Sequence, residues 1–249
     1  MSQVSIVTPA YNAALFLKDM VNSVIAQTFT NWEMIIVDDC STDDTFSIAK
    51  SLEAKDSRIK VFRNDANLGV ALTRNRALDI ASGPYIAFLD ADDLWEPRKL
   101  EKQIAFMESG QYVFTYTAYQ FFDSKTGEMG KIIHPPKEMT TNKIYGDTSI
   151  ACLTVIVNRE ISGPFHMPNI GHTEDNITWQ DILSKGYKAY LLDEVLAYYR
   201  HGNGSLTMNK KKAAAQQWLT YRTYYRFSRI KSAYYFCCYA INAIKKHYL

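Results

Sequence analysis

The sequence predicts an α/β fold with a mostly parallel central sheet flanked by helices, followed by a helical C-terminal extension. Three observations support this prediction. Strand-like and helix-like segments alternate through the first hundred residues, which is typical of βαβ units. The strand-like segments are continuously apolar and rich in β-branched residues, as in strands that are buried on both faces. After residue 209 the pattern becomes helical, basic and aromatic.

The composition indicates a folded protein rather than a disordered one. The 249 residues are 47% hydrophobic and 22% charged, and this length allows a sizeable core. We find no linker or internal repeat, and we expect a main domain over 1–205 and a basic, aromatic helical tail over 206–249. The longest apolar run, 233–241, falls short of the ~20 residues that a membrane-spanning helix needs. The four cysteines lack CxxC or metal-ligand spacing, which fits a reducing, cytoplasmic compartment.

The first half contains four expected strands and three expected helices. In chain order the strands are 4–8, 34–37, 59–62 and 85–89, and the helices cover 15–25, 42–52 and 69–81. A cap at Ser41 or Thr42 is expected to begin the second helix. Acidic residues follow the second strand, at Asp38 and Asp39, and others follow the fourth strand. Because parallel strands end at one edge of a sheet, we expect these acids to share a ligand there.

The second half is less regular. We expect strands at 112–122 and 150–158, a loop at 127–137, a helix at 173–185, and a hairpin or two short strands at 187–199. The tail is expected to be helical from 209 to 246, in two pieces that break near 228–232.

Three carboxylates crowd the end of the fourth strand, at Asp90, Asp92 and Asp93. Like charges at this spacing repel one another unless a cation lies among them. Carboxylates suit Mg²⁺ or Mn²⁺, and such an ion commonly binds one or two protein carboxylates together with substrate phosphates. The alternative is an acidic helix N-terminus ahead of Pro97. The spacing alone leaves both interpretations open.

Three further features have both a functional and a purely structural interpretation. The acidic turn at 38–44 could cap a helix or could accept hydrogen bonds from a base or a ribose. Arg74 lies on an otherwise apolar helix face and could bind phosphates or form a salt bridge. Glu174 and Asp175 begin a helix and could complement its dipole or supply a general base.

Taken together, the types, order and spacing of these features resemble the family-2 glycosyltransferases, which have a GT-A nucleotide-sugar-binding fold. The resemblance covers roughly residues 3–205. The segments that carry it are 4–12 and 36–43 as two nucleotide-binding loops, Asn67-Leu68-Gly69 with Arg74-Asn75, Asp90-Ala91-Asp92 as the DxD motif, Glu174-Asp175 with Trp179 as the ED motif, and Tyr199-Arg200 with Ser205. Two positions depart from the family pattern. Cys40 stands where relatives often have Gly, and Gly202 stands where they often have His, with His201 adjacent instead.

The resemblance implies an inverting transfer of a sugar from a nucleotide-sugar donor, by default a UDP-sugar, to a hydroxyl of a glycan acceptor. It also implies a lipid-linked acceptor in bacterial surface polysaccharide biosynthesis and Mn²⁺ or Mg²⁺ as the cofactor. Asp92 would hold the metal, and Asp175 and Glu174 would be the catalytic residues, with Asp175 taking the proton of the acceptor hydroxyl. The donor-binding residues implied are Pro9, Ala10 and Tyr11 around the nucleotide, Asp38 at the base, Arg74 at the base or phosphates, Asp90 at the ribose or a metal-bound water, and in addition Ala91 and Arg200.

Other classes of protein fit the sequence less well. The chief alternative is a catalytically inactive module that binds nucleotide-sugars or glycans, and the intact acids at Asp90, Asp92 and Asp175 speak against it. A sugar nucleotidyltransferase would need a glycine-rich, basic loop after the first strand, and a dinucleotide oxidoreductase would need GxGxxG there. Residues 9–12 match neither pattern.

The formal net charge of +2 conceals a strong division along the chain. Residues 1–194 hold 18 basic and 26 acidic residues, a net charge of −8, whereas 195–249 hold ten basic residues and no acidic one. Twelve of the 33 aromatic residues also lie in that last segment. Basic and aromatic residues together are typical of helices on anionic lipid, so we expect 208–249 to contact the inner face of the plasma membrane peripherally. Packing of the tail on the acidic body is the alternative, and no nucleic-acid-binding motif is present.

Overall fold

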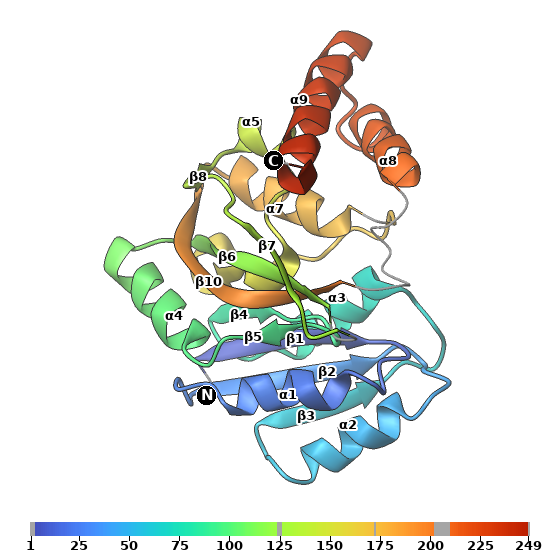
Figure 1. Cartoon of the computed structure of the whole chain (residues 1–249), viewed down its shortest axis with the longest axis vertical. Coiled ribbons are helices and arrows are strands. Elements are labelled where there is room, and N and C mark those ends of the chain that lie inside the picture. Colours follow the sequence, from blue (N-terminus) through green and yellow to red (C-terminus); the bar gives the residue numbers. More distant parts are fainter. Residues whose placement is uncertain (1–2, 124–125, 172, 202–209, 249) are drawn as a thin grey trace.

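The computed structural model describes residues 3–123, 126–171, 173–201 and 210–248, and it shows one sheet layered between helices (Figure 1). The elements of the first half are β1 (Val4–Ala10), α1 (Leu17–Ile25), β2 (Trp32–Asp38), α2 (Thr45–Glu53), β3 (Ile59–Arg63), α3 (Val70–Ile80), β4 (Tyr85–Phe88), β5 (Leu94–Trp95) and α4 (Lys99–Gly110). The elements that follow are β6 (Phe114–Asp123), β7 (Met129–Ile133), β8 (Glu138–Met139), α5 (Thr141–Ile144), a 3₁₀ turn (Cys152–Thr154), β9 (Ile156–Asn158), α6 (Arg159–Ser162), α7 (Glu174–Ser184), β10 (Ala189–His201), α8 (Lys210–Thr223) and α9 (Arg229–Tyr248).

Ten strands form one mixed sheet in the order β3-β2-β1-β4-β9-β6-β10-β5, with β7 paired to β6 and β8 paired to β10. Strands β1 to β4 are parallel to one another, and Val7 of β1 pairs with Ile35 of β2 on one side and Phe88 of β4 on the other. Strand β9 runs antiparallel between β4 and β6. The predicted α/β fold, with a mostly parallel sheet and C-terminal helices, is confirmed.

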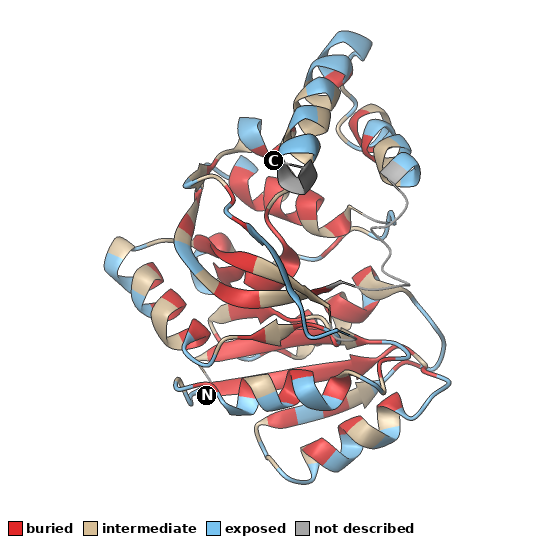
Figure 2. Cartoon of the chain, viewed as in Figure 1, coloured by how far each residue is buried: buried red, intermediate tan, exposed pale blue. Residues whose placement is uncertain are grey.

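Both faces of the sheet are covered, because successive side chains of a strand point to opposite sides. Ile6 of β1 joins a core with α1, α2 and α4, whereas its neighbour Val7 joins a second core with α3 and α7. Every residue of β2 is buried. Figure 2 shows the same continuous burial through the central strands. The apolar, β-branched runs of the sequence therefore correspond to strands buried on both faces.

Two expectations for the second half are wrong. The segment 127–137, expected to be a loop, contains β7, which pairs antiparallel with β6. The segment 187–199 is neither a hairpin nor two strands, because β10 runs through it without a break. Its pairing with β6 shifts register between Leu192 and Val195 and again before Ala197. Asp193 and Glu194, which suggest a turn in the sequence, lie at the first of these irregularities.

Three boundaries also differ from the expectation. Helix α2 is not capped by Ser41 or Thr42; the Asp43 carboxylate instead accepts a hydrogen bond from the Thr45 N–H at 3.0 Å. Within 150–158 only β9 is a strand, and a 3₁₀ turn precedes it. The break between the two tail helices falls at 224–228, a few residues earlier than expected.

The two tail helices project from the α7 side of the body, away from β1, β2 and β3 (Figure 1). An aromatic cluster holds them there, with Tyr145 of the body at its centre. Its ring centroid lies 4.9 Å from those of Tyr225 and Phe227 and 5.0 Å from that of Tyr235. One face of the tail thus packs on the body. Among the described residues, no helix combines the length and the hydropathy needed to cross a bilayer.

Helix α9 approaches the body most closely at Gly146. A β-carbon at this position would lie 2.6 Å from the Cβ of Cys238, so only glycine permits the contact. Asn242, one turn further along α9, donates a hydrogen bond from Nδ2 to the Gly146 carbonyl at 2.8 Å. The position of α9 against the body is therefore set by side chains of α9 that pack on, and bond to, residues 145–146. The predicted boundary between 205 and 206 lies outside the described residues.

Candidate active site

The loops that follow β1 and β2 are fastened to each other by side-chain hydrogen bonds. The Asn12 N–H donates to Ser41 Oγ at 3.0 Å, and the Thr42 N–H donates to Asn12 Oδ1 at 2.9 Å. Both loops contain left-handed backbone, with φ of +48° at Asn12 and +59° at Cys40. This conformation suits asparagine but costs other residues about 1–2 kcal/mol. A glycine at the Cys40 position would adopt this conformation without strain.

Pro9, Ala10 and Tyr11 lie at the end of β1, beside the end of β2. Ala10 pairs in register with Asp38, and its carbonyl accepts a hydrogen bond at 2.8 Å from the N–H of Asp39, the first residue after β2. The side chain of Tyr11 is half exposed at the edge of the sheet. The structure thus brings the three residues to the edge at which parallel strands bind ligands.

Asp38 is fully buried at the same edge. Its Oδ2 accepts a hydrogen bond from the Ser41 N–H at 3.1 Å and lies 3.2 Å from Nε of Arg63. Its Oδ1 has no hydrogen-bond partner within the described part of the chain. Because buried polar atoms are rarely left unpaired, this oxygen is an acceptor that a ligand can satisfy.

Asp39 has a positioning role that the sequence did not assign. Its carboxylate accepts hydrogen bonds from the Leu68 N–H, the Gly69 N–H and Asn64 Nδ2, each at 2.8 Å. Although burial alone would raise the pKa of Asp39, these hydrogen bonds hold it below its usual value. Gly69, at φ +85°, is the N-cap residue of α3. Asp39 therefore fixes the helix that carries Arg74. The only signal in the sequence was the pair Asp38-Asp39, and it could not show which of the two side chains binds the loop before α3.

Arg74 joins the two acidic motifs. Its guanidinium is buried, with Nη2 at 2.5 Å from Oδ1 of Asp90 and Nη1 at 3.4 Å from Oε1 of Glu174. Although burial opposes the charged form, the two carboxylates raise the pKa of Arg74. The structure shows the salt bridges of Arg74, and its contact with a base or phosphates stays a prediction. One cation thus connects the end of β4 to the start of α7.

The three aspartates after β4 occupy different environments. Asp93 is buried and accepts a hydrogen bond from the Arg200 N–H at 2.8 Å. Burial, followed by the nearby charges of Asp92 and Asp90, raises the pKa of Asp93 well above its usual value. Asp92 is exposed, while the small Ala91 between the acids is buried. Desolvation by the surrounding protein, and then the charge of Asp90, also raise the pKa of Asp92. Asp92 is thus the carboxylate of this motif that is open to a ligand.

This arrangement fits a divalent cation that arrives with its substrate. Among the described residues, no group of three or more His, Cys, Asp or Glu side chains is arranged to hold a metal on its own. Mg²⁺ is usually held by one or two carboxylates plus substrate phosphates, and Mn²⁺ favours the same oxygen ligands. The side chain of Asp92 is accessible, and desolvation, followed by repulsion from Asp90, disfavours its negative charge. A bound cation would relieve that repulsion. Asp92, with Asp90 beside it, would therefore hold the ion.

Arg200, at the end of β10, secures the same loop. Its Nε donates a hydrogen bond to the Asp92 carbonyl at 2.5 Å, and its guanidinium carbon lies 4.4 Å from the ring centroid of Phe16 and 4.6 Å from that of Phe122. Burial lowers the pKa of Arg200. The side chain of His201, together with Gly202 and Ser205, lies outside the described residues.

Glu174 and Asp175 begin α7 and differ in exposure. Glu174 is buried, and its Oε2 has no hydrogen-bond partner within the part of the chain that the structure describes. Burial, and then the charge of Asp175, raises the pKa of Glu174 to about 7. Asp175 is only partly buried, and its Oδ1 accepts a hydrogen bond from the Asn176 N–H at 2.7 Å. A carboxylate that is partly accessible, beside a buried one, can take a proton from a substrate hydroxyl.

The chain matches the protein family described as Glycosyl transferase family 2 over residues 5–162. It is 44% identical to the Bacillus subtilis (strain 168) protein TuaG, which is named for teichuronic acid biosynthesis, over 98% of this chain and 96% of that protein. It is 38% identical to the Escherichia coli protein WfgD, a UDP-Glc:alpha-D-GlcNAc-diphosphoundecaprenol beta-1,3-glucosyltransferase, over 98% of this chain and 94% of that protein.

Solved structures share the fold at low sequence identity. The mannosyltransferase PcManGT from Pyrobaculum calidifontis, in complex with GDP-Man and Mn²⁺, has a TM-score of 0.72 at 16% identity, and the match covers 98% of this chain and 75% of that one. TarS 1–349 of S. aureus, in complex with UDP-GlcNAc, has a TM-score of 0.67 at 21% identity, covering 98% of this chain and 72% of that one.

Proposed function

The chain belongs to glycosyl transferase family 2 and is a glycosyltransferase of bacterial polysaccharide biosynthesis, and from this premise we propose that it moves a hexose from UDP onto a lipid-linked saccharide with inversion at the anomeric carbon. The observation that carries the proposal is the double ion pair of Arg74. These ion pairs bring the acidic motif that would face the donor diphosphate next to the acidic motif that would face the acceptor hydroxyl. UDP-glucose is the first donor to consider, because the similar WfgD is named for that donor.

The donor would lie across the ends of β1, β2 and β4. The Oδ1 of Asp38, which has no hydrogen-bond partner among the described residues, can accept a hydrogen bond from a base N–H, and the exposed ring of Tyr11 can pack on the base. A divalent ion at Asp92 would supply positive charge to the diphosphate as it leaves. Arg74, neutralised by its two carboxylates, would act on the donor mainly by holding Asp90 in place.

The transfer step follows from the position of Asp175. The acceptor hydroxyl oxygen forms a bond to the anomeric carbon on the face opposite the diphosphate, and the bond from that carbon to the diphosphate oxygen breaks. The electron pair of the broken bond leaves with the nucleoside diphosphate, and the hydroxyl proton passes to the Asp175 carboxylate. Glu174 would be a positioning residue, because it joins the start of α7 to Arg74.

Activity with a lipid-linked acceptor tests the proposal directly. The purified chain is supplied with UDP-glucose, Mn²⁺ and an N-acetylglucosamine diphospholipid. The expected product carries glucose in the β configuration, inverted from the α configuration of the donor, as read from the anomeric proton coupling. A product of retained configuration would contradict the mechanism. Failure to consume any of a panel of nucleotide-sugars would favour the alternative of an inactive binding module.

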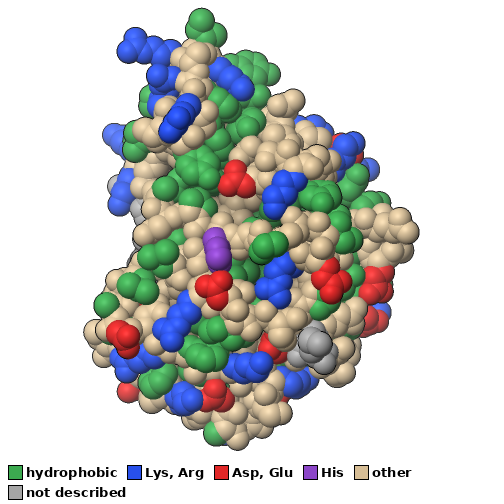
Figure 3. Space-filling view, turned by 180° about the vertical axis from the view of Figure 1, so that it is seen from behind, with side chains coloured by type: hydrophobic (Ala, Val, Ile, Leu, Met, Phe, Trp, Pro, Cys, Tyr) green, Lys and Arg blue, Asp and Glu red, His purple; other side chains and the backbone are tan. Residues whose placement is uncertain are grey.

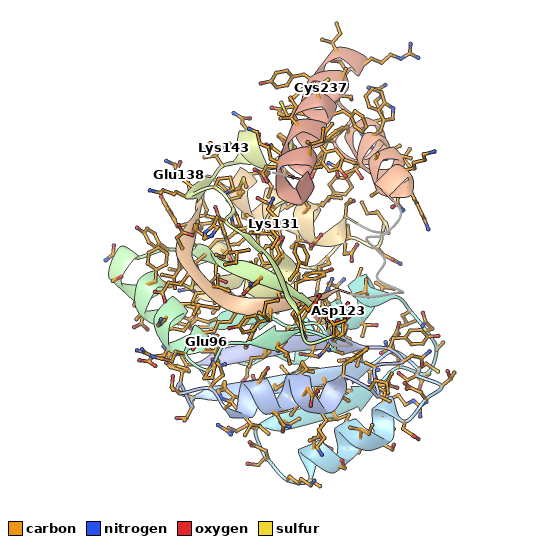
Figure 4. All side chains as sticks on the ribbon, in the orientation of Figure 1. Glu96, Asp123, Lys131, Glu138, Lys143 and Cys237 are labelled. Atoms are coloured by element: carbon orange, nitrogen blue, oxygen red, sulfur yellow. The ribbon has the colours of Figure 1, made fainter. Side chains whose placement is uncertain are left out.

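The lipid-linked acceptor also gives the tail a partner, an anionic membrane at the inner face of the plasma membrane. The outer face of α9 carries apolar residues at alternating spacings of four and three: Ile230, Tyr234, Cys237, Ile241 and Ile244. All five are exposed, with Ile230 at 85%. An ordinary surface helix presents polar residues on that side. Figure 4 marks Cys237 on this projecting helix, well away from Glu96 and Asp123 in the body.

The charges around this face favour lipid over a second copy of the chain. Arg229, Lys231 and Lys245 flank the apolar residues, and no acidic residue follows Glu194 in the sequence. Lys and Arg gather over the projecting helices, whereas both signs of charge mingle over the body (Figure 3). Two copies facing each other across α9 would bring like charges together, whereas anionic headgroups would neutralise them. This face would hold the enzyme beside its acceptor.

A further inference from the structure

We infer that a cavity between the start of α7 and one face of α8 is the binding subsite for the acceptor saccharide, an inference that rests on the proposed function. The cavity has a volume of about 360 Å³. Its lining residues are Ile170, Thr173, Gln216, Leu219, Thr220, Thr223 and Tyr224. The volume is at the lower end of the range for ligand pockets, roughly 300–1,000 Å³, and suits a small saccharide.

The cavity lies at the end of α7 that carries the candidate base. Thr173 lines it and is also the N-cap residue of α7, immediately before Glu174 and Asp175. The residues that would hold the donor belong to other elements, at the ends of β1, β2 and β4. A saccharide in the cavity would therefore lie on the Asp175 side of the site, where an attacking hydroxyl must be.

The chemistry of the walls fits a neutral sugar. Five of the seven lining side chains carry a hydroxyl or an amide group, and none of the seven is charged. The Oε1 atom of Gln216 is buried and has no hydrogen-bond partner among the described residues, so it can accept from a sugar hydroxyl. Leu219, more than half exposed, offers apolar surface to the C–H face of a sugar ring. Without a lysine or arginine in its lining, the cavity does not suit the diphosphate of either substrate.

The wall formed by α8 is firmly placed. Tyr221 is fully buried and donates a hydrogen bond to the Tyr145 carbonyl of the body. On the cavity side, the hydroxyl groups of Thr173 and Thr220 lie 3.2 Å apart. Tyr224 donates a hydrogen bond to Oδ2 of Asp181, on α7, at 3.0 Å. The tail would therefore shape the acceptor site as well as carry the membrane-facing helix.

Filling the cavity tests this inference. Leu219→Trp places a large ring at the exposed rim, and the matched control Ala215→Trp changes an exposed residue of α8 that does not line the cavity. Steady-state kinetics with UDP-glucose and a short-chain N-acetylglucosamine diphospholipid should show at least a tenfold higher acceptor KM for Leu219→Trp. The donor KM should stay within twofold, and the control should match the wild type.

The outcomes separate the two proposals. An unchanged acceptor KM in Leu219→Trp, or a donor KM that rises by the same factor, would overturn the acceptor subsite. If Leu219→Trp melts well below the wild type, Thr223→Trp, at a second exposed lining position, decides in its place by the same criteria. A wild-type chain that turns over no nucleotide-sugar would instead refute the proposed function.

Discussion

The proposed donor side and the proposed acceptor side of this molecule are built in different ways. On the donor side, buried parallel strands end at one edge, and their loops are fixed by buried carboxylates such as Asp39 and by the Arg74 ion pairs. On the acceptor side, α8 and α9 are attached through aromatic side chains around Tyr145, and much of their surface is exposed (Figure 2). We infer from the difference that a donor site fixed by buried contacts is combined with an attached element that would determine which acceptor is reached.

The two sides meet where Arg74 pairs with Asp90 and Glu174, and removing the charge of Glu174 tests how this contact is stabilised. The raised pKa of Glu174, about 7 against the ordinary 4.5, means that the folded state keeps a proton that the unfolded state releases between these values. The free energy of unfolding should therefore fall as the pH rises from about 5 to about 8, and Glu174→Gln should make that fall smaller by about 2–3 kcal/mol. Urea denaturation of wild type and variant across this pH range measures the difference.

The control for this measurement is Glu138→Gln, which alters a carboxylate on the surface strand β8. Its unfolding free energy should follow the wild type at every pH. A difference between wild type and Glu174→Gln that stays constant from pH 5 to 8 would contradict the assigned pKa shift.

Substitutions on the outer face of α9 should have a smaller effect, which is limited to membrane binding. Ile230→Ser combined with Ile241→Ser should reduce flotation with vesicles containing anionic lipid at least tenfold, since burying an isoleucine contributes roughly 1.5–3 kcal/mol. Stability should change little, because both side chains are exposed, at 85% and 54%. The matched control is Leu15→Ser with Ile161→Ser, whose side chains are 85% and 52% exposed. Equal flotation of the two double variants would remove α9 as the membrane contact.

Features that depend on local sequence could be predicted, whereas contacts between distant parts of the chain could not. The parallel strands and both acidic motifs were predictable, because strand periodicity and local spacing carry them. The ion pair of Arg74 with Glu174 was not, since it joins residues a hundred positions apart and depends on how α3 and α7 pack. The long β10 was missed because its pairing irregularity near Asp193 resembles a turn. The two faces of α9 could not be assigned until Tyr145 and Gly146 were placed.

The central claim is that Asp175, held beside the Arg74 junction, accepts the acceptor's proton, and one comparison tests it most directly. Donor affinity and transfer rate are measured side by side for wild type, for Asp175→Asn, and for Asp79→Asn, which alters an exposed carboxylate on α3. We predict that Asp175→Asn keeps the donor Kd within threefold and loses roughly 10²–10⁴-fold in kcat, as expected when a general base is removed. The control should resemble the wild type in both. Transfer by Asp175→Asn at the wild-type rate, or a loss of donor affinity that matches the loss of rate, would contradict the account.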